Sequence, residues 1–248
     1  MKQQIHTVPV VKAFQSGDEC PFCHLHRDAE RRAIRFYAGP SASYMEPEIR
    51  KITTQTGFCQ EHTKKLYDYG NQLGSALMVQ SHYADLLEEL QTQLKNYEIP
   101  KKRLFPSKKE KNIPFWQHLQ ERTAQCSVCN QLNDSLDRHY QVFFSLLKEQ
   151  EFCRMLEASK GFCIPHFARM LQMAEKHLPQ RKAEWFYPTV YRVMEQNMVR
   201  VKEDLEWYIQ KHDYRFVSAD WKNSKDSLQR AMQKISAGYP DDPPFRKD

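Results

Sequence analysis

Apolar side chains recur at intervals of three and four residues along much of the chain, as they do on one face of an α-helix. The clearest example is 71–96, whose apolar stripe we interpret as a face packed on the core. That stripe comprises Leu73, Leu77, Tyr83, Leu87, Leu90 and Leu94. The pattern also predicts helices over 23–38, 62–70, 115–125, 129–147, 166–177, 180–212 and 222–237. Only seven glycines occur, and Leu, Glu, Gln, Lys and Arg are frequent, so the sequence predicts an all-α protein.

The chain contains an internal repeat built on cysteine and histidine. Cys20–Cys23 reads CxxC and is followed by GFCxxH at Gly57–His62, with 35 residues between Cys23 and Cys59. Cys126–Cys129 and Gly161–His166 repeat this pattern, with 33 residues between Cys129 and Cys163. The pattern uses six of the seven cysteines, so we predict two pseudo-repeated helical halves.

This residue spacing is typical of a zinc site. A CxxC turn brings two thiolates to one ion at about 2.3 Å, and CxxH supplies the second pair of ligands. We therefore predict two Zn²⁺ per chain at helix N-termini, with each half stapled by its own Cys₃His site. The predicted ligands are Cys20, Cys23, Cys59 and His62 in the first half, and Cys126, Cys129, Cys163 and His166 in the second. An iron–sulfur centre on the same ligands is the alternative.

Other uses of the cysteines have weaker support. Three disulfides would need a secretory context, and a thioredoxin-type pair at Cys20 and Cys23 would need a βαβ pattern, which the sequence does not show. The haem-attachment string CxxCH matches the first motif only, because Asn130 replaces its histidine in the second. We expect Cys153 to be a buried apolar residue. We expect His24 and His26 to lie on the surface or beside the first site.

The motifs and the proline positions divide the chain into four parts. We predict a first zinc-stapled half over 1–98, a basic, proline-containing linker over 99–114, and a second half over 115–212. Residues 213–248 are predicted to form a C-terminal latch helix and tail, anchored by Trp221. The predicted helix 180–212 carries a heavy aromatic load, which we interpret as core, with an aromatic ligand pocket as the alternative.

Charge and hydropathy narrow the possible partners. The net charge is +6 from 37 basic and 31 acidic residues, and it falls to about +4 if each zinc site carries one net negative charge. This excess is too small to imply a nucleic-acid partner by itself. No stretch approaches the roughly 20 apolar residues of a membrane span, and no secretory signal is evident. We therefore expect a soluble, cytoplasmic protein without a membrane partner.

With the repeat located, the chain resembles an uncharacterised bacterial family, found mostly in Firmicutes and catalogued as a domain of unknown function. The resemblance covers nearly the whole chain and implies the architecture but no activity. It rests on Cys20–Cys23, Tyr44–Arg50, Gly57–Cys59 with His62, Asn71–Gly74, the second CxxC, the second GFC motif up to Phe167, and Asp213–Phe216.

Three functions are compatible with these features. We favour a non-enzymatic module that binds a protein or a small molecule, because four protein ligands leave no open position on zinc. Nucleic-acid binding through the basic linker is the second hypothesis, with Phe105 as a stacking residue. A thiol redox sensor or metalloenzyme is the third, with Glu46, Glu48 and Arg50 as candidate residues between the ligand pairs.

Overall fold

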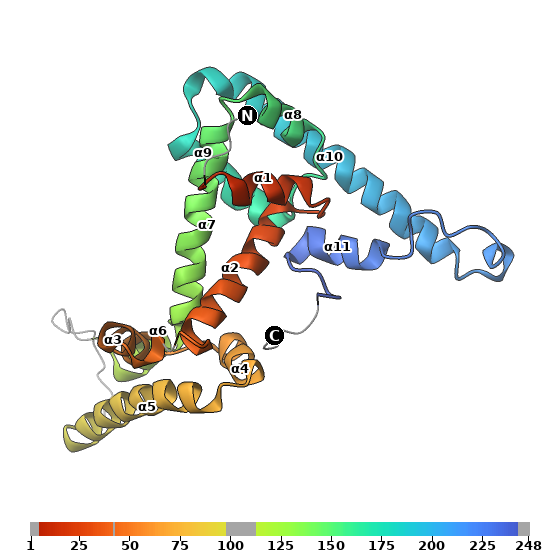
Figure 1. Ribbon diagram of the computed structural model, residues 1–248. Helices are drawn as coiled ribbons and strands as arrows, with labels where there is room; N and C mark the ends of the chain where they lie inside the picture. Colours follow the sequence, from red (N-terminus) through yellow and green to blue (C-terminus); the bar gives the residue numbers. More distant parts are fainter. Residues whose placement is uncertain (1–4, 42, 98–112, 243–248) are drawn as a thin grey trace, which may run out of the picture. The chain divides into compact units, whose positions relative to one another are not determined.

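The computed structural model describes residues 5–41, 43–97 and 113–242. These residues form eleven α-helices and two short 3₁₀ helices, with no strand among them (Figure 1). The prediction of an all-α protein is therefore confirmed. The elements are α1 (Val8–Gln15), α2 (Pro21–Ala38), η1 (Ser43–Met45), α3 (Pro47–Thr56), α4 (Gln60–Tyr69), α5 (Gln72–Lys95), α6 (Phe115–Ala124), α7 (Ser127–Leu146), α8 (Gln150–Glu157), α9 (Ile164–His177), α10 (Gln180–Gln210), η2 (Tyr214–Phe216) and α11 (Ser227–Ser236).

The helices follow the same order around both copies of the motif. One short helix precedes each CxxC, and a long helix, α2 or α7, begins within it. A short helix then precedes each GFC, another begins at it, and a long helix, α5 or α10, follows. The four predicted helices that follow ligand pairs are present, each beginning two residues earlier than predicted.

The chain divides into two compact units that do not coincide with the two halves of the sequence. Among the described residues, unit 1 contains 5–29 and 134–242, and unit 2 contains 30–41, 43–97 and 113–133. The chain passes from one unit to the other within α2 and again within α7. Each unit therefore combines segments from both repeats.

Aromatic packing dominates the core of unit 1. Phe22, at the start of α2, stacks on Tyr140 of α7 with ring centroids 4.0 Å apart. Phe143 is fully buried and contacts several further rings, including those of Phe14 and Phe186. Cys153 is also buried, with its thiol donating to the Leu147 carbonyl, so the prediction for this cysteine is confirmed.

In unit 2, the end of α2 packs with α4 and the start of α7, and α3 packs along α5. Only Gly74 and Met78 of α5 are buried. The interpretation of the 71–96 stripe as core is therefore wrong for most of its members. Leu73 and Leu94 are 71% and 77% exposed, and Tyr83, Leu87 and Leu90 are exposed as well. The helix is turned so that the narrow Gly74–Met78 face meets its neighbours and the stripe faces outward.

The C-terminal latch helix forms as α11, which is shorter than predicted, and it packs on α10 and α9 within unit 1. Trp221 lies against Tyr208 and His212 of the α10 region, as an anchor would. None of the described helices combines the length and the apolar character needed to cross a membrane. Nearly all of the predicted basic linker, 99–114, lies outside the described residues.

Candidate metal centres

The eight predicted ligands form two groups, each with its ligand atoms within 4.8 Å of one another. The grouping differs from the prediction. Group 1 consists of Cys20, Cys23, Cys163 and His166, and group 2 of Cys59, His62, Cys126 and Cys129. The predicted pairing of each CxxC with the CxxH of its own half is therefore wrong, because the motifs combine crosswise.

Helix length explains the crosswise arrangement. Cys20 lies just before α2, whose 18 residues carry the chain about 27 Å away from it. The returning helix α3 has only 10 residues, about 15 Å, so Cys59 stops short of the start of α2. In the second half, 20 residues of α7 are followed by 8 residues of α8, with the same result.

Group 1 is closed to solvent. Cys20 and Cys163 are fully buried, and Cys23 and His166 are nearly so. The Nδ1 atom of His166 lies 3.6, 3.5 and 3.1 Å from the sulfurs of Cys20, Cys23 and Cys163. The Cys23 and Cys163 sulfurs are 3.7 Å apart, well beyond a disulfide bond of about 2.05 Å. The four atoms are thus arranged as separate ligands around a common centre.

Group 2 has the same arrangement but is less buried, since Cys59 and Cys129 are partly exposed. The Nδ1 atom of His62 lies 3.2, 3.4 and 3.2 Å from the sulfurs of Cys59, Cys126 and Cys129. A backbone hydrogen bond from Ser127 N to Gly57 O, 3.0 Å long, ties the two ligand-bearing turns together. Pro21 occupies the corresponding position in the first CxxC and has no N–H to donate.

The GFC turns place two ligands at the start of a helix. Cys59 and Cys163 are the N-cap residues of α4 and α9, so His62 and His166 lie within the first turn, on the same side. Gly57 precedes the first turn with φ +57° and ψ −151°, a region open essentially to glycine alone. A Cβ there would also lie 2.6 Å from Nε2 of His82.

Both groups lie at helix N-termini, as predicted: group 1 at α2 and α9, group 2 at α4 and α7. In group 2, burial opposes ionisation of Cys126, but hydrogen bonds from His62 and the backbone lower its pKa to about 6. Burial likewise opposes protonation of His62, yet Cys126 and Glu30 raise its pKa to about 10. In group 1, hydrogen bonding with Cys163 lowers the pKa of Cys23, whereas burial raises that of Cys20. One thiol at each centre, Cys126 or Cys23, is therefore favoured as a thiolate, which is the form that binds a metal cation.

A carboxylate orients the histidine of group 2. Nε2 of His62 lies 3.1 Å from Oε1 of Glu30, and Lys65 holds the same oxygen at 2.7 Å. This contact points Nδ1 toward the thiols, as carboxylates behind metal-bound histidines do. The repeat places Leu136, an apolar residue, at the position in α7 that corresponds to Glu30. The two centres therefore differ in their surroundings as well as in their burial.

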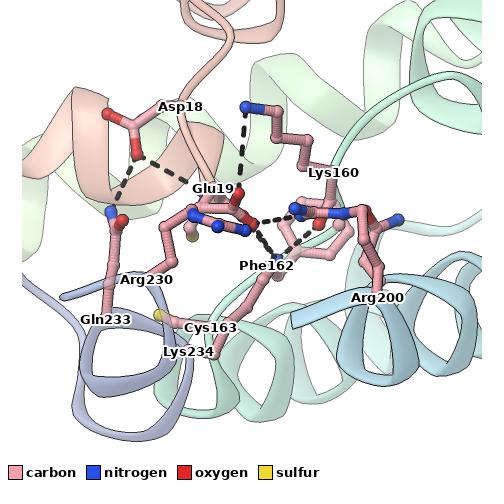
Figure 2. A network of polar contacts seen from close by, with 12 residues as sticks. Asp18, Glu19, Lys160, Phe162, Cys163, Arg200, Arg230, Gln233 and Lys234 are labelled. Atoms are coloured by element: carbon pink, nitrogen blue, oxygen red, sulfur yellow. Dashed lines mark hydrogen bonds and ion pairs between the residues drawn. The ribbon is translucent and has the colours of Figure 1, made fainter. Parts of the chain in front are cut away.

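The latch helix α11 supports group 1 through one buried lysine (Figure 2). Lys234 is 1% exposed and donates to the carbonyls of Glu19, at 2.7 Å, and Lys160. These carbonyls belong to the turns that precede Cys20 and Cys163, so one ammonium group holds both turns. Burial lowers the pKa of Lys234, while Glu19, whose Oε2 lies 3.4 Å away, opposes that effect.

The structure gives contacts for three other residues singled out in the sequence. His24 pairs with Asp28 at 3.8 Å, and the ring of His26 lies 6.1 Å from that of His166. Arg50 donates to Ser81 and Tyr44, so it ties α3 to its neighbours and has a structural contact. Glu30 and Lys234 were missed by sequence reasoning, because neither stands near a motif in the sequence.

Fold and site together define an all-helical protein with two Cys₃His groups that could each hold a metal ion. The chain belongs to the family of unknown function DUF6062, whose model matches residues 1–242. Searches of curated proteins and of solved structures found no match.

Replacing Gly57 by Ala should weaken group 2. The substitution combines an unfavourable backbone conformation with a clash against His82, so we expect a loss of unfolding free energy of about 2–4 kcal/mol and reduced metal retention. Gly70→Ala is the matched control, because Gly70 also has positive φ but has nothing within 4 Å of the added Cβ. Equal effects of the two substitutions in chemical denaturation would contradict the proposed close contact.

Replacing Lys234 by Met should loosen group 1. The variant keeps the side-chain length but leaves two buried carbonyls without their donor, which should cost about 2–4 kcal/mol of unfolding free energy. Lys225→Met removes an exposed lysine nearby and should change stability by less than about 0.5 kcal/mol. The unfolding midpoint and the metal content of both variants provide the measurement, and an unaffected Lys234→Met protein would refute the role of this lysine.

Metal release to a chelator should occur in two phases. Group 2 has two partly exposed cysteines, whereas group 1 is buried throughout, so a chelator should remove metal from group 2 first. A colorimetric zinc indicator would follow the time course after zinc loading. Cys126→Ala should abolish the fast phase and leave the slow one. If this substitution abolished the slow phase, release from group 2 before group 1 would be wrong.

Proposed function

We propose that the protein is a zinc-binding helical module with two structural Cys₃His sites. The observation that carries the proposal is the geometry of the two groups. A tetrahedral zinc ion with Zn–S of about 2.3 Å and Zn–N of about 2.0–2.1 Å has edges of about 3.8 Å between sulfurs and about 3.6 Å between sulfur and nitrogen. The sulfur–sulfur separations of 3.7 and 3.8 Å agree closely, and the sulfur–nitrogen separations of 3.1–3.6 Å approach this edge length.

The compact grouping favours a single ion over an iron–sulfur cluster. A cluster places several iron and sulfide atoms between its protein ligands and spreads them apart. Here all four ligand atoms of each group lie within 4.8 Å of one another. One borderline-soft ion with no geometric preference of its own, such as Zn²⁺, suits this donor set.

Four protein ligands complete the tetrahedron, which supports a structural role for each zinc ion. Catalytic zinc sites retain a position for water or substrate. We propose that the metal holds the two ligand-bearing turns of each unit together, and that the protein acts by binding a protein or small-molecule partner. A cavity of about 390 Å³ in unit 2 supports this, because Phe58, Leu66, Met78 and Val79 give it an apolar lining suited to a partner's side chain or a small ligand.

Metal analysis of paired cysteine variants tests both the metal and the crosswise grouping. Cys59→Ala/Cys126→Ala removes two ligands of group 2 and should leave about one zinc ion per chain, at group 1. Cys20→Ala/Cys59→Ala removes one ligand from each group and should lower the content of both sites.

Grouping within each half of the sequence gives the opposite result, since Cys20 and Cys59 would then share one site. Elemental analysis of both variants beside the wild-type chain distinguishes the two schemes. Iron in place of zinc, or less than one metal ion per wild-type chain, would overturn the proposal. Removal of zinc should also unfold the protein, as measured by circular dichroism.

A further inference from the structure

The outward face of α5 carries a continuous seam that the metal sites do not use. Its members are Leu73, Ala76, Gln80, Tyr83, Leu87, Leu90 and Leu94. They follow one another at alternating intervals of three and four residues, which is the repeat of a coiled-coil seam. Gln80 is the single polar member. Because α5 turns Gly74 and Met78 toward its neighbours, the seam on the opposite side of the helix faces outward.

The seam is too large to be an ordinary surface feature. Its four leucines are between 45% and 77% exposed, and Tyr83 is 68% exposed. With the adjoining Val79, these side chains expose several hundred Å² per chain, the size of the roughly 300–600 Å² apolar patch that is the largest on a typical monomer and is often functional. The area approaches the ~800 Å² that each partner contributes to a standard interface.

The flanks of the seam indicate what covers it. In coiled coils, charges at the flanking positions select the partner and its orientation. Here the flanking residues are uncharged: Gln72, Leu77, Val79, Ala84, Leu86, Gln91 and Gln93. A charged partner helix would find no complementary charge on them, whereas a second copy of the same seam meets neither repulsion nor an unpaired charge.

We infer that α5 is a self-association surface on which two copies of the chain pair antiparallel through this seam. In that register Ala76 of one copy faces Leu94 of the other, so a small residue meets a large one, and Tyr83 faces Leu87 near the two-fold axis. The antiparallel orientation also opposes the two helix dipoles. The 390 Å³ cavity, which Ala76 and Val79 line, lies where Leu94 of the other copy enters. The inference names the partner of the binding module proposed above.

Sedimentation of the zinc-loaded, full-length protein over a range of concentrations tests this inference. We expect a wild-type dimer, and a dissociation constant raised by about 100-fold or more in Leu87→Glu/Leu90→Glu, because buried seam positions dominate such interfaces. The matched control is Val199→Glu/Ile209→Glu, which introduces the same charges at exposed apolar positions of α10 and should dimerise like wild type. A monomeric wild-type chain, or a seam variant that dimerises like wild type, overturns the inference.

A charge swap tests the register. Ala76→Glu and Leu94→Lys should each weaken the dimer, and the double variant should recover at least about 10-fold of the loss, since Glu at position 76 then faces Lys at position 94 of the other copy. A parallel pair would place like charges opposite each other, so absence of recovery overturns the antiparallel arrangement. Circular dichroism and zinc content establish that each variant is folded. A monomer with two zinc ions refutes the dimer alone, and a dimer without metal refutes the zinc proposal alone.

Discussion

The rest of the structure depends on the crowding of three thiol groups and one imidazole at each of two centres. Thiolates brought this close repel one another, so the arrangement needs a cation at its middle or protons on the sulfurs. At both centres the ligands come from distant parts of the chain. In group 1, for example, Cys23 and His166 are 143 residues apart. Fixing the two ligand-bearing turns also fixes the starts of the helices that carry them. The packing of each unit then follows from those helix positions.

The crosswise grouping connects the folding of the two repeats. The start of α2 supplies ligands to group 1, while the end of the same helix belongs to the core of unit 2. In the same way α7 begins at group 2 and ends in the aromatic core of unit 1. Neither repeat can complete a centre from its own sequence in this fold. The repeat is therefore a pattern of the sequence, whereas each compact unit is built from both copies.

The sequence predicts the helices and the set of eight ligands, but not the grouping of those ligands. Spacing alone cannot decide the grouping, because the 35 residues between Cys23 and Cys59 could return to the start of the helix if they were extended. The short α3 prevents that return, and no helix was predicted over 47–56. The outward seam of α5 was misread for a related reason, since a helical stripe has the same spacing whether it faces a core or a partner. Glu30 and Lys234 act through contacts over long sequence separations, which no local motif records.

The two ligand groups and the outward seam of α5 are different parts of the molecule, and the seam contains none of the eight ligands. Group 2 anchors the start of α4, and α4 and α5 together line the apolar cavity beside the seam. If group 2 holds an ion as proposed, its loss would free the start of α4 beside α5, even though none of the four ligands belongs to the seam. Under the proposed function, an ion at group 2 would act at a distance, by fixing α4, which lines the cavity together with α5, and so limiting the motion of α5. A rigid helix loses little conformational freedom on association, so more of the free energy of burying its leucines remains available for binding.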